Sequence, residues 1–172
     1  MMKSLGGYKI GGRAVVFGGY DLVGDQFTKD TDFGKTRPFI GLPVYYDHAL
    51  GNLRSQIGVV TKWVQTEEGI DVEIEIDRAH KYAEQIMELV RRNMLGMSTG
   101  AIGHLVERLQ NWIKTWPVGE LSLTPTPAEP RTVAYAAAKS NGKAGNRSLI
   151  VPAYVIDSNR TKGHPTMDKQ EL

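Results

Sequence analysis

Hydrophobic and acidic residues alternate along residues 70–77, where the apolar positions are Ile70, Val72, Ile74 and Ile76. A strict period of two places one face of a strand against the core and leaves the other face in water. Less regular stretches of the same kind cover residues 8–17, 43–48, 55–66, 101–114 and 116–124. The pattern predicts a protein built mainly from short strands, and the glycine pair in the first stretch is typical of a bulge.

The period changes over residues 78–92, where small and apolar residues recur at helical spacing and two arginines stand near the end. This predicts one amphipathic helix that ends near Gly96. Many strands with a single flanking helix indicate an antiparallel β-barrel or highly curved sheet. Prolines at positions 125, 127 and 130 cannot continue a central strand, so we expect the domain to close soon after them.

The sequence becomes small and polar from about residue 136, which predicts a domain over 1–135 and a flexible tail or linker over 136–172. Residues 132–172 carry six Lys or Arg and three Asp or Glu, so residues 1–131 have a net charge of only −1. A body of that charge matches a phosphate backbone poorly, and we expect no nucleic-acid partner. The chain has no cysteine and no apolar run of membrane-spanning length, so we expect neither disulfides nor a membrane anchor.

His48 differs from the other three histidines because it ends a short strand and precedes a loop. A side chain in that place is held by the strand and stays accessible to solvent. His104 stands among apolar residues and fits a histidine within a strand. A solvated histidine is the ordinary interpretation of any of them, so His48 alone does not establish a function.

Ser98 lies in NMLGMSTGA, residues 93–101, where more small and hydroxyl residues gather than the exit of a helix requires. The segment does not match the GxSxG pattern of hydrolases, and by itself it indicates turn chemistry. Glu120 shares one strand face with Ser122, opposite two leucines. That face alone would indicate a solvated surface, but Glu120 also supplies the acid that a Ser–His pair requires.

The order YDHALGN, GMSTG and ELSLTPTPAEP resembles that of the prohead proteases of tailed bacteriophages, over about residues 8–135. The resemblance implies a β-barrel related to the herpesvirus assemblins, with His48 as general base and Ser98 as nucleophile. It implies an acid as third member, for which Glu120 stands in the expected place. The same resemblance, with the small residues around Ser98, suggests an oxyanion or substrate-backbone region at Thr99, Gly100 and Arg131.

The resemblance implies a serine endopeptidase without metal or cofactor. Its partners would be the phage major capsid protein and a scaffold protein, cleaved inside the immature head in the host cytoplasm; a homodimer is compatible with it. Residues 134–140 would be a self-cleavage region or an inert linker. Two alternatives stay open: a catalytically inactive barrel that acts as a scaffold or assembly module, and, third, a nucleic-acid-binding barrel.

Overall fold

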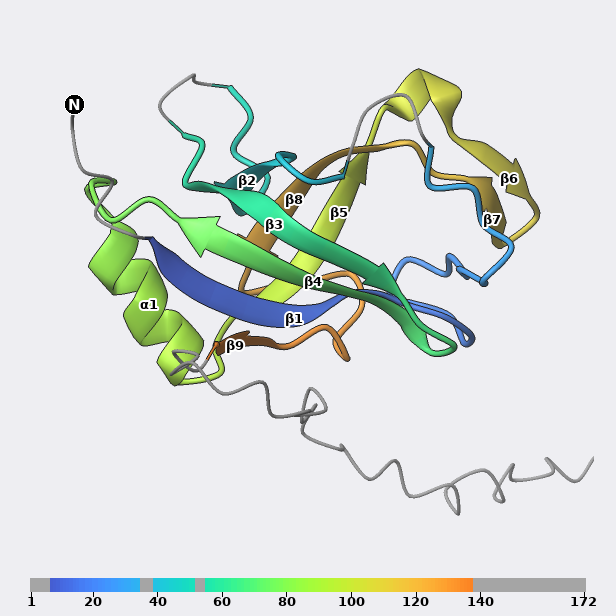
Figure 1. Cartoon of the computed structure of the whole chain (residues 1–172). Helices are drawn as coiled ribbons and strands as arrows, with labels where there is room; N and C mark the ends of the chain where they lie inside the picture. The colour runs from blue at the N-terminus through green and yellow to red at the C-terminus, as the bar shows by residue number, and fades with distance from the viewer. Residues whose placement is uncertain (1–6, 35–38, 52–54, 138–172) are drawn as a thin grey trace, which may run out of the picture.

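The computed structural model describes residues 7–34, 39–51 and 55–137. These residues form a curled seven-stranded sheet, one α-helix, a short 3₁₀-helix and a two-stranded hairpin (Figure 1). The elements are β1 (Tyr8–Val16), β2 (Pro43–Tyr46), β3 (Gly58–Gln65), β4 (Gly69–Ile76), α1 (Ala83–Arg91), β5 (Gly96–Ala101), η1 (Gly103–Leu105), β6 (Glu107–Leu109), β7 (Trp112–Thr115), β8 (Val118–Thr124) and β9 (Ala134–Ala136).

The strand order in the sheet is β5-β8-β2-β3-β4-β1-β9. Neighbouring strands are antiparallel except β2 and β8, which run parallel. The segment leading into β9 also meets β5: the Met97 N–H donates to the Thr132 carbonyl at 2.9 Å, and the Ala134 N–H donates to the Leu95 carbonyl at 3.0 Å. These bonds join the two ends of the sheet, so the predicted barrel-like architecture is confirmed.

The period-two stretch over residues 70–77 is strand β4, and Ile70, Ile74 and Ile76 are fully buried. The predicted bulge in β1 occurs between Arg13 and Val15 rather than at the glycine pair. Close packing explains the glycine at position 11 instead. A Cβ on Gly11 would lie 2.7 Å from the Tyr135 ring of β9, so that position has no room for a side chain.

The helix is shorter than the pattern predicts, because residues 78–82 form turns and α1 begins at Ala83. The carboxylate of Asp77 accepts the Ala79 N–H at 2.9 Å and stabilises the first of these turns. Within α1 the buried residues are Ala83, Ile86, Met87 and Val90. The helix lies at one end of the curled sheet, beside β1 and β9 (Figure 1).

Two predictions about residues 93–114 are wrong. The GMSTGA segment is strand β5 rather than a turn, and residues 101–114 are the end of β5, η1 and the β6–β7 hairpin rather than one strand. His104 consequently lies exposed in η1 and not in a strand. At the far end, β9 runs to Ala136, and the Ala137 N–H donates to the Lys9 carbonyl at 2.9 Å. Residues 138–172 of the expected tail lie outside the described residues.

Candidate active site

His48 follows β2 in a tight turn whose two central residues, Asp47 and His48, have φ of 50° and 54°. A left-handed conformation at a residue other than glycine is disfavoured and persists only where neighbouring groups hold it. Strand β8 supplies those groups. The Asp47 N–H donates to the Leu123 carbonyl at 2.9 Å, and Thr124 Oγ1 donates to the Asp47 carboxylate at 2.7 Å. The turn is therefore fixed against β8, at a strand end as predicted.

The imidazole of His48 makes a short hydrogen bond to Glu120, with 2.7 Å between Nδ1 and Oε1. Glu120 is only 4% exposed, whereas the His48 side chain is 41% exposed. The hydrogen bond to Glu120 raises the pKa of His48 above its ordinary value; partial burial of the ring opposes this, and the charges of Glu120 and Asp47 add to it. The Glu120 face of β8 is thus buried, which corrects the interpretation of a solvated strand face.

Ser122 also belongs to this network, although the alternation along residues 116–124 indicates only that it shares a strand face with Glu120. Its hydroxyl donates to Glu120 Oε2 at 2.7 Å and lies 3.3 Å from the backbone nitrogen of His48, whose N–H it accepts. Ser122 is fully buried. Both oxygens of the Glu120 carboxylate therefore have hydrogen-bond partners, as a buried charge requires.

Ser98 enters the site through strand register. In the antiparallel pair of β5 and β8, Ser98 stands opposite Ser122, and Gly100 stands opposite Glu120. Directly paired residues present their side chains on the same face, with Cβ atoms about 5 Å apart. The three neighbouring strands β5, β8 and β2 thus bring Ser98, Glu120 and the turn of His48 to one face. Ser98 and His48, both described, make no hydrogen bond to each other in this structure.

The small residues near Ser98 accommodate neighbouring groups of the protein, and the expected substrate-backbone region at Thr99 and Gly100 stays a prediction. A Cβ on Gly100 would lie 2.8 Å from Cδ of Glu120 and even closer to Oε1. A Cβ on Gly96 would lie 2.5 Å from the Thr132 carbonyl oxygen. The Thr99 hydroxyl accepts a hydrogen bond from the Trp116 indole at 3.0 Å. Gly100 therefore makes space for the buried acid.

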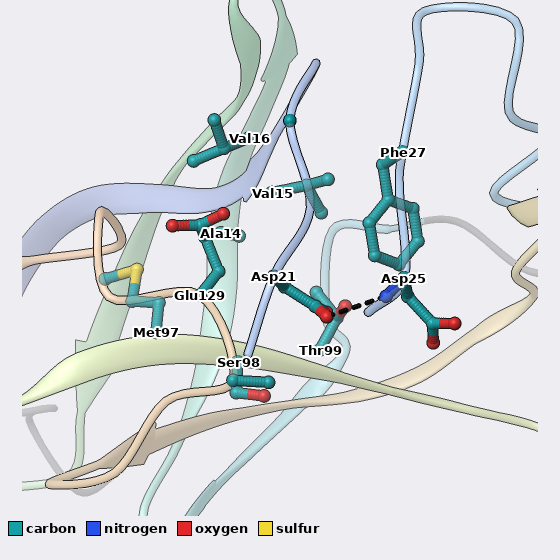
Figure 2. Close-up of a pocket in the computed structure, with 12 residues that line it drawn as sticks. Ala14, Val15, Val16, Asp21, Asp25, Phe27, Met97, Ser98, Thr99 and Glu129 are labelled. Atoms are coloured by element: carbon teal, nitrogen blue, oxygen red, sulfur yellow. Dashed lines mark hydrogen bonds between the residues drawn. The ribbon is translucent and has the colours of Figure 1, made fainter. Parts of the chain in front are cut away.

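The backbone N–H of Thr99 points away from β8. Met97 directs its N–H to Thr132 rather than to β8, and backbone groups two residues apart in a strand point the same way. Ser98 and Thr99 also form part of a small pocket with Asp21, Phe27 and Glu129 (Figure 2). The N–H of Thr99 is consequently a candidate donor on the pocket side of the strand.

Arg131 lies beside the same pocket, but its guanidinium is already paired. Nε and Nη2 donate to the two carboxylate oxygens of Glu129 at 2.8 and 2.6 Å, and Nη2 also donates to the Gly18 carbonyl at 3.1 Å. Of these residues, Glu129 lines the pocket together with Ser98. The structure thus shows Arg131 supporting the pocket wall through Glu129, and a role at the oxyanion stays a prediction.

Within residues 7–34, 39–51 and 55–137, no cluster of three or more His, Asp or Glu side chains is arranged to hold a metal ion. Over the same residues, no helix has the length and apolar character needed to cross a membrane.

Neither protein-family models nor curated proteins match this chain. Several solved structures are similar to it. The protease of Kaposi's sarcoma-associated herpesvirus, in complex with a hexapeptide phosphonate inhibitor, aligns with a TM-score of 0.53 and 16% identity, over 77% of this chain and 65% of that one. The same viral protease with an allosteric inhibitor aligns with a TM-score of 0.50 and 16% identity, over 76% and 78%. The chain thus spans about two thirds of the first protease, and its fold is assemblin-like.

Proposed function

We propose that this protein is a serine endopeptidase in which Ser98 is the nucleophile, His48 the general base and Glu120 the orienting acid. The observation that carries the proposal is the 2.7 Å hydrogen bond between His48 and a nearly fully buried Glu120. A buried carboxylate that binds one nitrogen of a half-exposed imidazole is the arrangement that serine hydrolases use to prepare a base. The strand register adds Ser98 to the same face.

The hydrogen bond also supports different roles for the two imidazole nitrogens in the proposed reaction. Nδ1–H donates to Glu120, which leaves Nε2 with its lone pair toward the remaining side of the ring. In the proposed reaction Nε2 accepts the proton of Ser98 as its oxygen attacks the scissile carbonyl. The imidazolium then returns that proton to the leaving amine, and water activated by the same nitrogen hydrolyses the acyl-enzyme. The outward N–H of Thr99 is the proposed donor to the oxyanion.

The proposed substrates are the scaffold protein and the extensions of the major capsid protein, cleaved inside an immature phage head in the host cytoplasm. Two observations support this: the motif order that resembles prohead proteases, and the assemblin-like fold. A homodimer belongs to the same proposal, and neither a cofactor nor a metal is required for the chemistry described.

A catalytically inactive barrel that serves as an assembly module is the second candidate. It is favoured by one observation, the lack of a hydrogen bond between Ser98 and His48 in this structure. Hydrogen bonds to a nucleophile are often long before substrate binds, so the observation does not decide between the two functions.

Labelling with a fluorophosphonate probe tests the proposal directly, because only an activated serine reacts quickly. We expect one covalent adduct, located at Ser98 by peptide mass spectrometry. Ser98→Ala should abolish it and His48→Ala should strongly reduce it. Ser55→Ala is the control, because Ser55 lines a different pocket, with His80 and Tyr82, and it should label like the wild type. A folded wild-type protein that does not react would support the assembly module instead.

A further inference from the structure

The hydroxyl of Ser122 is bonded to both halves of the His48–Glu120 pair. It donates to Glu120 Oε2 at 2.7 Å and accepts the backbone N–H of His48, with 3.3 Å between the heavy atoms. A single oxygen thus contacts the carboxylate of the acid and the main chain of the base. No step of the proposed reaction uses this serine, although it is fully buried and stands directly opposite Ser98.

The two bonds restrict two different motions. Glu120 Oε1 is bound to the ring of His48 and Oε2 to Ser122, so the carboxylate plane is fixed at both ends. The backbone of His48 has a positive φ, and Ser122 is one of the groups that hold the turn in this conformation. Without the hydroxyl, Glu120 would keep one partner, and a buried carboxylate oxygen would be left unsatisfied.

We propose that Ser122 is a positioning residue that sets the orientation of Glu120 toward His48 and thereby prepares the base. The inference rests on the proposed function for its catalytic meaning. The hydrogen-bond network that it describes, however, can be measured in a protein of any activity.

The pKa of His48 is the readout that separates positioning from simple packing. The charged groups that act on the ring are Glu120 and Asp47, and the hydrogen bond to Glu120 makes the largest contribution to the raised pKa. If Ser122 holds Glu120 in place, then Ser122→Ala weakens that bond, and the pKa of His48 falls toward its ordinary value near 6.5. A serine that only fills space would leave the pKa unchanged.

The experiment is an NMR titration of the His48 ring protons, combined with the rate of fluorophosphonate labelling, in the full chain. We expect Ser122→Ala to lower the pKa of His48 and to slow labelling on the order of tenfold to a hundredfold, the cost of misplacing a reacting group. Ser122→Cys keeps nearly the same volume but is a poor hydrogen-bond partner. It should therefore shift both quantities in the same direction.

Thr31→Val is the matched control. The Thr31 hydroxyl is also buried and also makes two hydrogen bonds, to the Ile113 carbonyl at 2.8 Å and from the Thr28 N–H at 3.1 Å, but it lies outside the His48 network. This variant should lose stability without changing the pKa of His48 or the labelling rate. A pKa of His48 that stays or rises in folded Ser122→Ala and Ser122→Cys would overturn the proposal. If the wild type does not label at all, the titration alone still decides it.

Discussion

The carboxylate of Glu120 lies against the α-carbon of Gly100, its partner on the neighbouring strand β5, and a Cβ at position 100 would come within 2.9 Å of Glu120 Cγ and nearer still to Oε1. The glycine of the GMSTG segment is thus complementary in shape to an acid 20 residues later in the chain. This relationship links β5, which carries Ser98, to β8, which carries Glu120, through shape alone.

Gly100→Ala should therefore disturb catalysis through Glu120. The new methyl group would push the buried carboxylate away from His48, and the rate of fluorophosphonate labelling should fall on the order of tenfold to a hundredfold. The pKa of His48 should decrease at the same time. Gly103→Ala is the matched control, because a Cβ at that position meets nothing within 4 Å. Normal labelling by Gly100→Ala would show that Glu120 can move without consequence.

Ser98→Ala and His48→Ala should each remove nearly all proteolysis of an unstructured substrate such as fluorescent casein. The double variant should be little worse than either single variant, because residues that act as one unit are not additive. All three proteins should stay folded, since Ser98 is only half-buried and the His48 side chain is 41% exposed. Circular dichroism checks the fold, and wild-type cleavage by Ser98→Ala would refute the nucleophile assignment.

Glu120→Gln should keep the fold and slow cleavage by several orders of magnitude, because the amide can hold the ring in the wrong tautomer, a change that costs about 10⁴-fold in a well-studied triad. The pH dependence gives a second check. The base form of His48 is lost as pH falls through its raised pKa, so the wild-type rate decreases on that side. Removing the carboxylate lowers this pKa and should move the decrease to lower pH.

A loss of about tenfold or less in Glu120→Gln would instead point to another partner for His48. Asp47 is then the residue to test, because its charge also acts on the ring. His104 is the weaker candidate, since it lies exposed in η1.

Self-processing should occur beyond β9. Residues Ala134–Ala136 pair with β1, and a bound substrate must be free to enter the site in an extended form. We therefore expect any cleavage within 134–140 to fall after Ala137. Intact-mass spectrometry after incubation should show the loss of about 30 C-terminal residues in the wild type and not in Ser98→Ala. Identical masses would leave the segment as an inert linker.

Period-two patterning predicted the sheet correctly because it reports burial of one face, and Ile70, Val72, Ile74 and Ile76 of β4 are all buried. The other face is only partly in water, since Asp71 is buried too and pairs with Arg13. The same logic failed for the Glu120 face. Polar side chains there are buried because a distant turn covers them, and a local pattern contains no information about such a cover. The prediction for the GMSTGA segment is wrong for a related reason. Its glycines make room for Glu120 and for the Thr132 carbonyl, which lie on other parts of the chain.

His48 could be singled out from its place at a strand end. Glu120 could be singled out from its strand face and from the order of motifs in the chain, which resembles that of a known family. Ser122 could not, because its importance depends on two hydrogen bonds that only the folded register creates. The positive φ of Asp47 and His48 was equally hidden, since neither residue is a glycine and the strain is held by contacts to β8.

The parallel pairing of β2 with β8 has a consequence for timing. Its register joins Tyr45 to Ser122, and the His48–Glu120 bond closes a loop of 72 residues. Contacts of such high sequence separation form slowly, because closing a long loop costs conformational entropy. A nascent chain that has not yet emerged as far as β8 therefore holds the histidine without its acid. If the protein is the proposed protease, its catalytic pair therefore cannot assemble until β8 has been made and has paired with β2.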